Sequence, residues 1–396
     1  AQKPIYDAAK RAMMSWPAFR MAFSNYTFSV TDGDGNEKQV NPADVWKTSA
    51  ARVTIDGERY RPDRAGERLI DEGGSRFVNT YRAAKITAAH DPRLEAMWLR
   101  FLEHLLPDEA ERAWFANWIA HKVQHPHERG AAVLMVGSTH GTGRGSLFKV
   151  LEGVFGPSMY SLGAKALTGT ESQSSYNGWQ AEAVLVTVHE LTAAAPNWRS
   201  RRSVYDTLKE TIDPDVQEVE IKQKYKPAYS GPVYTSFLLA TNNDGALPIE
   251  QADRRFAVLR NGGSLDDRRD LDEFYARRDD PALHAAVLHQ LQSVETDAKA
   301  FRTRPATEAR QDMIEGGRSE IDHAAREIVA QLQEEGREAV AMSEVVTRVQ
   351  TLLGVTEPGS IRAAKGVVPN VLHEMEAGRE GVAVAARQRV AVGGGK

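Results

Sequence analysis

The sequence predicts an α/β protein in which a parallel sheet is covered by helices on both faces. Three short, nearly continuous apolar runs indicate buried strands: AAVLMV (131–136), AVLVTV (183–188) and TSFLLA (235–240). Runs of about six residues that are rich in branched side chains and separated by helical stretches are typical of such strands. A glycine-rich turn follows the first run, and polar clusters follow the other two. Because ligands collect at the carboxyl ends of strands in open α/β sheets, the three clusters together predict a binding site.

The composition is ordinary for a soluble globular protein, and it excludes several classes. With 396 residues, of which 41% are hydrophobic and 26% charged, the chain is expected to form two to four domains. A net charge of -4 excludes a uniformly basic DNA-coating protein, so any nucleic-acid surface is a local patch. The chain has no cysteine, which excludes disulfides and fits a reducing compartment. No run approaches the ~18–20 apolar residues of a membrane span, so we expect no membrane partner.

The segments before and after the first strands have their own patterns. We expect an N-terminal accessory domain over 1–92, where VTDGDGNEKQV is typical of a hairpin with an Asp-Gly turn. Apolar residues at helical spacing predict a helical collar over 93–128, which Pro107 divides into two helices. The predicted sheet domain covers 129–262, and a helical lid and linker follow over 263–315.

The C-terminal residues 316–396 predict a winged-helix-like domain. Two helical patterns, from Ile321 and from Val345, precede a third apolar segment and the sequence GVAVAARQRVAV. That last sequence alternates like a two-stranded hairpin, and three helices with a hairpin are typical of winged-helix modules that contact duplex DNA. Arg387 and Arg389 in the hairpin are therefore candidate DNA-binding residues.

The turn after the first strand, GSTHGTGRGSL (137–147), is a candidate phosphate-binding loop. Glycines let backbone N–H groups approach phosphate oxygens closely, and the helix that follows adds its dipole. The loop departs from the pattern G-x-x-x-x-G-K-[ST], because Arg144 stands for Lys and Gly145 offers no hydroxyl for Mg²⁺. Ser146 is the nearest substitute, one position late. The candidate ligand-binding residues are Gly141, Thr142, Gly143, Arg144, Gly145, Ser146 and Leu147; the alternative is a glycine-rich turn with no ligand.

The other two strand ends supply an acid and an amide. Glu190 can hold the shell of a Mg²⁺ ion or activate a water molecule, whereas His189 before it is as compatible with a hydrogen-bonded strand end as with catalysis. Asn242 can both donate and accept, as contact with a γ-phosphate and an attacking water requires. The Arg254–Arg255 pair suits an arginine finger from a neighbouring subunit, and an ordinary ion pair with Asp253 is the alternative.

A basic hairpin is predicted between the second and third clusters, over 219–226. It carries interleaved cations and an aromatic ring, a pattern that can grip single-stranded DNA by phosphate contact and stacking. Its candidate residues are Lys222, Lys224, Tyr225 and Lys226. A solvated charged hairpin is the alternative. Elsewhere, His121, His125 and His127 have a spacing that could hold a metal, but no obvious acid completes a site.

In this order, the motifs resemble those of superfamily 3 helicases. They look closest to the helicase portion of phage and plasmid primase–helicases, a group related to poxvirus primase–helicases. The likeness covers roughly residues 93–262. It rests on GTGRGSLFKVLEGVFG, LKETIDPD, ATNND and DRRFAVL, together with LTGTESQSSYNGWQAEAVLVTVHE before the acid.

The resemblance implies an AAA+-like P-loop core, ATP and Mg²⁺ at subunit interfaces of a ring hexamer, and a hairpin that moves single-stranded DNA through the pore. Arg144 takes the role of the loop lysine, Glu190 that of the acid, and Asn242 that of the sensor. Arg254 or Arg255 becomes the finger in trans, and Lys209 matches a family lysine upstream of the hairpin. A primase domain often precedes this region in the family, and none is recognisable here. We therefore expect a fragment or a stand-alone helicase, and the resemblance implies a primase domain or partner.

Three functions remain open on this basis. The first is an ATP-dependent replicative DNA helicase of a phage, plasmid or integrated element, in the cytoplasm of a bacterial host, with a C-terminal domain that contacts origin DNA. The second is a replication-initiation scaffold that binds nucleotide and DNA but scarcely hydrolyses ATP, because positions 144, 145 and 189 are changed. The third is an unrelated AAA+ machine that remodels proteins.

Overall fold

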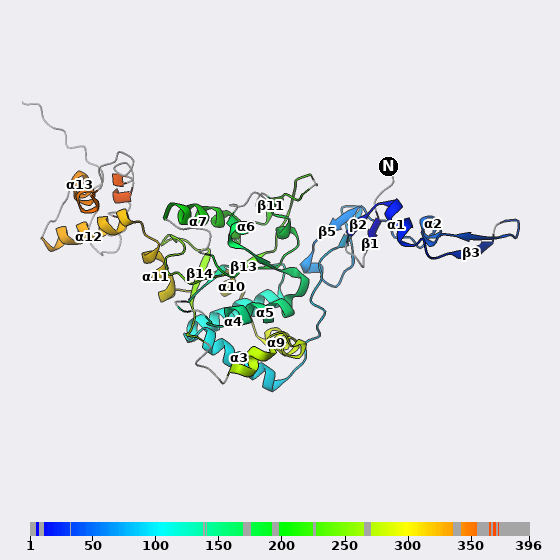
Figure 1. Cartoon of the computed structure of the whole chain (residues 1–396), viewed down its shortest axis with the longest axis horizontal. Helices are drawn as coiled ribbons and strands as arrows, with labels where there is room; N and C mark the ends of the chain where they lie inside the picture. The colour runs from blue at the N-terminus through cyan, green and yellow to red at the C-terminus, as the bar shows by residue number, and fades with distance from the viewer. Residues whose placement is uncertain are drawn as a thin grey trace, which may run out of the picture.

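A five-stranded parallel sheet forms the centre of the molecule in a computed structural model of the chain (Figure 1). The structure describes residues 5–7, 12–31, 33–137, 139, 141–168, 176–191, 198–224, 227–264, 271–335, 342–354, 364–365, 367–369 and 371. The strands of the sheet are β8 (Ala132–Val136), β9 (Met159–Leu162), β10 (Leu185–Val188), β13 (Ser236–Thr241) and β14 (Phe256–Arg260). Three of them confirm the predicted apolar runs.

The strand order is β14-β8-β13-β10-β9, and every neighbouring pair is parallel. Successive residues of a strand point to opposite faces of the sheet, so each strand contributes side chains to two hydrophobic cores. On β8, Val133 and Met135 belong to one core, whereas Leu134 and Val136 belong to the other. This double burial is the physical reason why the strands read as continuous apolar runs.

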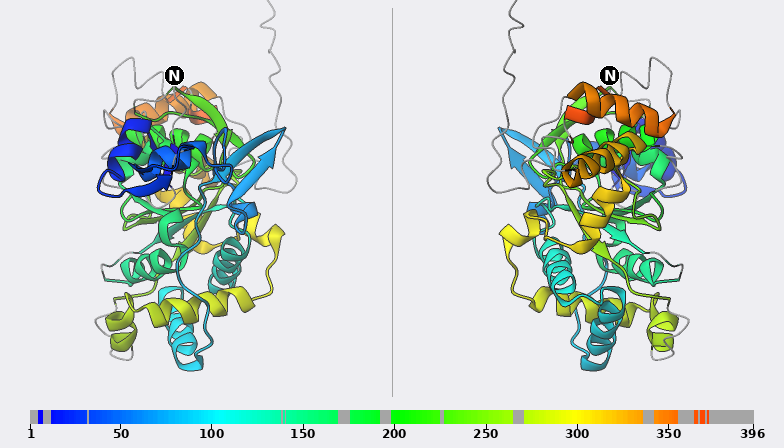
Figure 2. Two further views of the ribbon diagram at one scale, coloured as in Figure 1. Left: turned by 90° about the vertical axis from the view of Figure 1, so that its right-hand side faces the viewer. Right: turned by 90° about the vertical axis from the view of Figure 1, so that its left-hand side faces the viewer.

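The first face of the sheet is covered by α3 (Pro92–Leu105), α4 (Glu109–Gln124), α5 (Arg144–Phe155) and α9 (Pro281–Ser293). Figures 1 and 2 show these helices stacked below the sheet, with α3 and α9 in the outer layer. Asp91 and Asp108 cap α3 and α4, and Pro107 lies between the helices as predicted. The short helices α8 (Asp272–Arg277) and α10 (Ala298–Arg302) close this core, where Phe101 stacks on Phe274 at 4.0 Å between ring centroids.

The opposite face is covered by α6 (Ala164–Thr168), α7 (Trp198–Ile212) and α11 (Glu308–Gly316). A two-stranded antiparallel hairpin, β11 (Glu218–Ile221) and β12 (Tyr229–Pro232), follows α7. A hairpin was predicted here, but its second strand lies beyond the predicted range 219–226. Within the described residues, no helix has the length and apolar character that crossing a bilayer would require.

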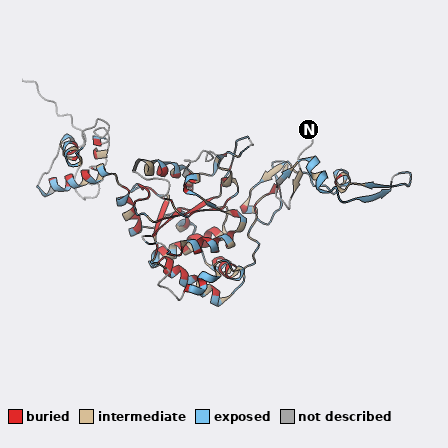
Figure 3. Cartoon of the chain, in the orientation of Figure 1, coloured by how far each residue is buried: buried red, intermediate tan, exposed pale blue. Residues whose placement is uncertain are grey.

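The N-terminal residues form small elements beside the central body. They comprise β1 (Ile5–Asp7), β2 (Ala12–Met14), α1 (Trp16–Ala22), β3 (Phe28–Thr31), β4 (Glu37–Val40), α2 (Pro42–Thr48), β5 (Gly57–Arg59), β6 (Leu69–Glu72) and β7 (Ser75–Asn79). β3 and β4 pair as the expected hairpin, and β5-β7-β6 form a second small sheet. Figure 3 shows that buried residues gather in the central body and are sparse in this region.

Two C-terminal helices, α12 (Glu320–Glu334) and α13 (Met342–Leu353), lie on the other side of the central body (Figure 1). They share a separate apolar core with the helical residues Ala364, Val368 and Val371. The predicted hairpin of the winged-helix domain, which includes Arg387 and Arg389, lies outside the described residues. The winged-helix assignment therefore stays a prediction.

Candidate functional site

The three predicted clusters lie at one edge of the sheet. The strand order places β8, β13 and β10 side by side, so the segments that follow them emerge next to one another. These segments are the glycine-rich loop, Asn242 and Glu190. The sequence-derived constellation is therefore a spatial cluster, although the strands that carry it are far apart along the chain.

Hydrogen bonds connect the cluster through Asn242. Its amide oxygen accepts from Arg144 Nη2, and its Nδ2 donates to Glu190 Oε2 at 2.8 Å. Arg144 Nη1 also donates to the carbonyl oxygen of Thr241, at 2.6 Å. Burial lowers the pKa of the Arg144 guanidinium, and Glu190 opposes that shift. Asn242 thus uses both ends of its amide to hold a cation and a carboxylate at fixed positions.

The loop has the backbone that a phosphate cradle requires. Gly141 and Gly143 adopt left-handed conformations, with φ of 74° and 97°, which side chains disfavour. Gly143 is also the N-cap of α5, so the first N–H groups of that helix have no partner within it. Unpaired N–H groups and the helix dipole at one point favour an anion. Ser138 and His140 of the loop lie outside the described residues.

The other residues of the glycine-rich loop differ in their exposure and in their hydrogen bonds. Gly145 is exposed, and a Cβ added there would meet no atom within 4 Å. Ser146 is 3% exposed, and no hydrogen bond joins its hydroxyl to another described residue. The buried hydroxyl of Thr142 also has no partner among these residues. Leu147 is fully buried and donates its N–H to Gly143, so it packs the helix against the core.

A fourth strand end contributes a residue that the sequence interpretation missed. Asn261 follows β14, is 7% exposed, and donates its backbone N–H to Val136 at 2.7 Å. Its Oδ1 is buried without a partner in the described chain, and it flanks Gly137 together with the Thr142 methyl group. The sequence FAVLRNGGS shows the same succession of an apolar run and a polar turn that identified the other clusters, so this signal was available.

His189 lies beside the cluster with its ring against α5. The imidazole and the Phe148 ring are nearly perpendicular, at 86°, with 4.7 Å between ring centroids. Burial lowers the pKa of His189, which favours the neutral ring at physiological pH. The residue as a whole is exposed, so the ring contacts α5 on one side only.

The Arg254–Arg255 pair precedes β14, so it lies at the edge of the sheet opposite the loop. Arg254 donates to Asp215 at 2.6 Å and its side chain is 68% exposed. Arg255 donates to Asp213 at 2.8 Å and is 26% exposed. Neither arginine joins the loop within one chain.

The candidate DNA-binding lysines are spread over two elements. Lys209, on α7, pairs with Glu250 at 3.1 Å and lies over the ring of Tyr205. Lys222 follows β11, is half-exposed and pairs with Glu220 at 2.8 Å. Lys224 is exposed in the turn between the hairpin strands. Tyr225 and Lys226 lie outside the described residues.

Two groups of histidines have different partners. Of the three histidines noted in the sequence, His121 is bonded at both ring nitrogens, to Glu128 and to Thr296, each at 3.1 Å. In a different place, His90 and His289 each approach the same oxygen of Glu95 at 2.9 Å. This second group joins the start of α3 to α9.

Comparison with solved structures shows that the fold is shared with a known protein. The apo structure of the NrS-1 C-terminal region (residues 305–718) aligns with a TM-score of 0.64 and 19% identity, over 83% of this chain and 86% of that one. A second form of the NrS-1 C-terminal region gives a TM-score of 0.58 and 18% identity, over 86% and 81%. JCV helicase bound to a small molecule aligns only at a TM-score of 0.33 and 11% identity, over 66% of both chains, which is too distant to bear on the fold.

Sequence comparisons give one family match. The model of a family of unknown function, DUF5906, matches residues 135–255, from within β8 to the residue before β14. This range contains the glycine-rich loop, Glu190, the hairpin and Asn242. A search of curated protein sequences finds no match.

Proposed function

We propose that this chain is an ATP-dependent DNA helicase of a replicating mobile element. The proposal rests on the hydrogen bonds that join Arg144 to Asn242 and Asn242 to Glu190. They lie at the end of a loop with two glycines in left-handed conformations. A cation, an amide and a carboxylate held at the end of a phosphate-type loop are the groups that phosphoryl transfer to water requires. The fold shared with the NrS-1 C-terminal region is compatible with the family resemblance of the motifs.

The residues present fit a nucleoside triphosphate with Mg²⁺. The free N–H groups at the start of α5 would bind phosphate oxygens, and Arg144 would bind the terminal phosphate with the guanidinium edge that Asn242 leaves open. Mg²⁺, when bound, supplies charge neutralisation between phosphates. The Ser146 hydroxyl and the Glu190 carboxylate are the groups that would hold its shell. Glu190 would also orient the attacking water, with Asn242 fixing the carboxylate.

The active form would be a ring with nucleotide between subunits. Arg254 and Arg255 lie away from the loop of their own chain, so a finger role requires the neighbouring copy. The β11–β12 hairpin would face the DNA strand and contact it through Lys222 and Lys224, together with Tyr225 and Lys226. We propose six copies, by the family resemblance, and propose DNA contacts for Lys209, Arg387 and Arg389 on the same basis.

One observation favours the scaffold as a second candidate. Arg144 is already bonded to Thr241 and Asn242, and Gly145 provides no hydroxyl for the metal. An arginine kept on the protein by these bonds would slow hydrolysis without preventing nucleotide from binding. Steady-state ATP turnover, measured with and without single-stranded DNA, separates the two functions.

The matched variant for this measurement is Glu190→Gln, which keeps the shape and the Asn242 contact but removes the charge. The helicase predicts turnover that single-stranded DNA stimulates and that Glu190→Gln abolishes while nucleotide binding persists. The scaffold predicts binding of nucleotide and DNA, no turnover in the parent chain, and no change in Glu190→Gln.

A further inference from the structure

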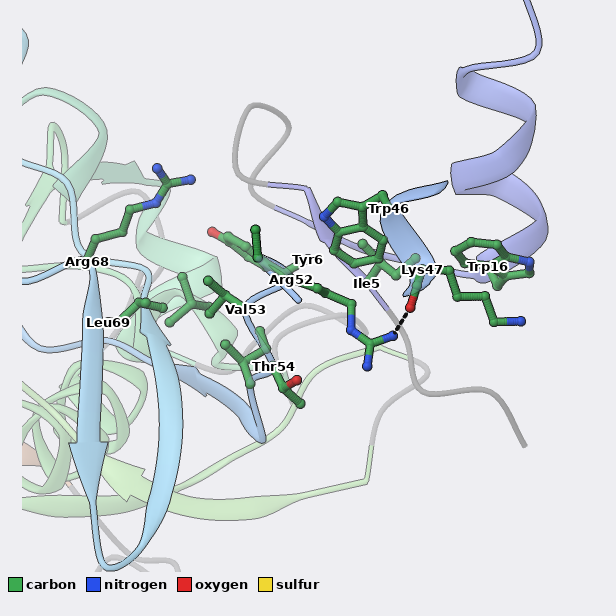
Figure 4. A pocket seen from close by; sticks show the side chains of 13 residues that line it. Ile5, Tyr6, Trp16, Trp46, Lys47, Arg52, Val53, Thr54, Arg68 and Leu69 are labelled. Atoms are coloured by element: carbon green, nitrogen blue, oxygen red, sulfur yellow. Dashed lines mark hydrogen bonds between the residues drawn. The ribbon is translucent and has the colours of Figure 1, made fainter. Parts of the chain in front are cut away.

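The N-terminal residues line an open cavity of about 610 Å³ that the proposed ATPase does not use. It is lined from β1, α1, α2, the segment 51–55 and the β6–β7 hairpin (Figure 4). The charged and aromatic lining residues are Tyr6, Trp16, Trp46, Lys47, Arg52 and Arg68. Cavities of this size lie within the range of small-molecule and nucleotide sites.

The charge of the cavity is one-sided. Lys47, Arg52 and Arg68 line it, and none of its 13 lining residues is acidic. Among the described residues, these three cations have no carboxylate within ion-pair distance. Most other arginines of the same region are neutralised by one; examples are the pairs of Arg20, Arg61, Arg64 and Arg76 with neighbouring acids. Unpaired cations around one cavity favour an anionic ligand.

The same cavity presents aromatic faces and a phenol without a partner. Lys47 Nζ lies 5.0 Å from the centre of the Trp16 ring, and Arg52 donates to the Lys47 carbonyl oxygen at 2.6 Å. The first contact holds Lys47 beside an indole ring, and the second ties Arg52 to the backbone of α2. The Tyr6 hydroxyl is buried and has no hydrogen-bond partner in the described chain. Figure 4 shows the Tyr6 ring inside the cavity, with its hydroxyl on the side from which Arg68 and Leu69 come.

We propose that this cavity binds one nucleotide unit of single-stranded DNA. The base would stack on the indole and phenol rings, because every base has a face suited to such stacking. Its phosphates would contact Arg52, Arg68 and Lys47. The cavity would be a second contact site for single-stranded DNA, separate from the β11–β12 hairpin. The choice of DNA as the strand rests on the proposed function.

The test measures the binding of labelled oligothymidylate to the full chain without ATP. Fluorescence anisotropy gives the affinity over a range of salt concentrations. Arg68→Ala should lower the affinity about tenfold at low salt and make the slope of log K against log salt shallower by about 0.7. The matched control is Arg76→Ala on the β6–β7 hairpin, which Arg68 immediately precedes. It removes the same charge from a side chain that is paired with Asp71 at 2.7 Å, so it should leave both quantities unchanged. Equal losses in the two variants, or no loss in Arg68→Ala, would overturn the proposal.

A second variant and two competitors identify the ligand. Lys47→Ala, at an exposed position, should repeat the effect of Arg68→Ala. A polyglutamate peptide should fail to displace the oligonucleotide, whereas thymidine monophosphate should displace it from the parent chain and not from Arg68→Ala. Displacement by polyglutamate that depends on Arg68 would replace the DNA proposal with a peptide site and so overturn it.

Failure of this proposal can be told apart from failure of the proposed function by Lys222→Ala, which alters the hairpin. Loss of DNA affinity in Lys222→Ala with parent affinity in Arg68→Ala contradicts the cavity and leaves the helicase intact. Loss in Arg68→Ala in a chain without any ATP turnover supports the cavity and contradicts the helicase.

Discussion

Asn242 bonds to Glu190 through its amide nitrogen, at 2.8 Å, while its amide oxygen accepts from Arg144. The two bonds lie at the ends of neighbouring parallel strands, where the chain positions side chains with little freedom. An amide in this place does what neither a carboxylate nor an amine can do, since it donates to an acid and accepts from a cation. We regard it as the residue that sets the geometry of the site.

Asn242→Ala should therefore lower ATP turnover about 100-fold, a loss comparable to that of one transition-state donor. Arg144 and Glu190 would each lose a partner, but the surrounding sheet would remain. Thermal unfolding should stay close to that of the parent chain, and nucleotide affinity should fall much less than turnover. Turnover within a factor of two of the parent chain would contradict the role given to Asn242.

Gly145→Ser should raise ATP turnover and the affinity for Mg²⁺. A Cβ at this position meets no atom within 4 Å, and the serine hydroxyl would stand at the position where the usual loop pattern has one. Serine also suits a helix slightly better than glycine, so stability should rise by about 0.5 kcal/mol. Ser146→Ala is the complementary change and should weaken the Mg²⁺ dependence. Increased stability without any change in Mg²⁺ dependence would argue against a metal at this end of α5.

Arg254→Ala and Arg255→Ala should have different effects. Arg254 is 68% exposed, so its removal should change stability by less than about 0.5 kcal/mol, yet reduce turnover about 1,000-fold if it is the finger. Arg255 is 26% exposed and pairs with Asp213, which is only 13% exposed. Its removal should lower stability by about 1–2 kcal/mol, because a largely buried carboxylate loses its partner. Mixing Arg254→Ala with Glu190→Gln should restore partial turnover, and a mixture as inactive as its parts would exclude a finger in trans.

Lys122→Met should destabilise the fold by about 3 kcal/mol. The Nζ of Lys122 is buried and donates to the carbonyl oxygens of Pro126, Glu128 and Tyr234 at 2.6–2.8 Å. Burial lowers the pKa of Lys122, whereas three acceptors around one nitrogen favour the protonated form. Methionine fills the volume but leaves three buried carbonyls unpaired, at about 1 kcal/mol each. Lys149→Met, at an exposed position of α5, is the control and should change the free energy of unfolding by less than about 0.5 kcal/mol.

Stability should fall as the pH is lowered from 7.5 to 5.5. Burial lowers the pKa of His121 below its ordinary value of 6.5, and burial lowers that of His189 in the same direction. When the pH drops through 6.5, the unfolded chain takes up protons before the folded chain does, which favours unfolding. Denaturant titrations at several pH values should show this loss, and His121→Gln should reduce it. A pH dependence that is identical in His121→Gln would assign the effect to other groups.

The sequence predicted the strands and the loop because both depend on local patterns. β8, β10 and β13 are buried on two faces, so their apolar runs could be recognised without tertiary information. β9 was not predicted because it is a strand of only four residues, MYSL, at the edge of the sheet. Three of these residues are partly buried and one is exposed, so they do not form an apolar run. The helices on either side of Pro107 followed from spacing and capping residues.

The partners of the site residues could not be predicted in the same way. The Arg144 contacts with Thr241 and Asn242 join positions about a hundred residues apart, and only the strand order brings them together. Asn261 carried a local signal, but its burial beside Gly137 depends on the pairing of β14 with β8. The pairing of Lys209 with Glu250 likewise depends on the packing of α7.

The most direct test of the central claim is strand displacement on a forked DNA duplex, with ATP or ATPγS, by the parent chain and by Glu190→Gln. The proposed helicase should release the displaced strand only with ATP, and only in the parent chain. Nucleotide-dependent DNA binding without displacement in the parent chain, under conditions where the protein is assembled and bound to the fork, would contradict it.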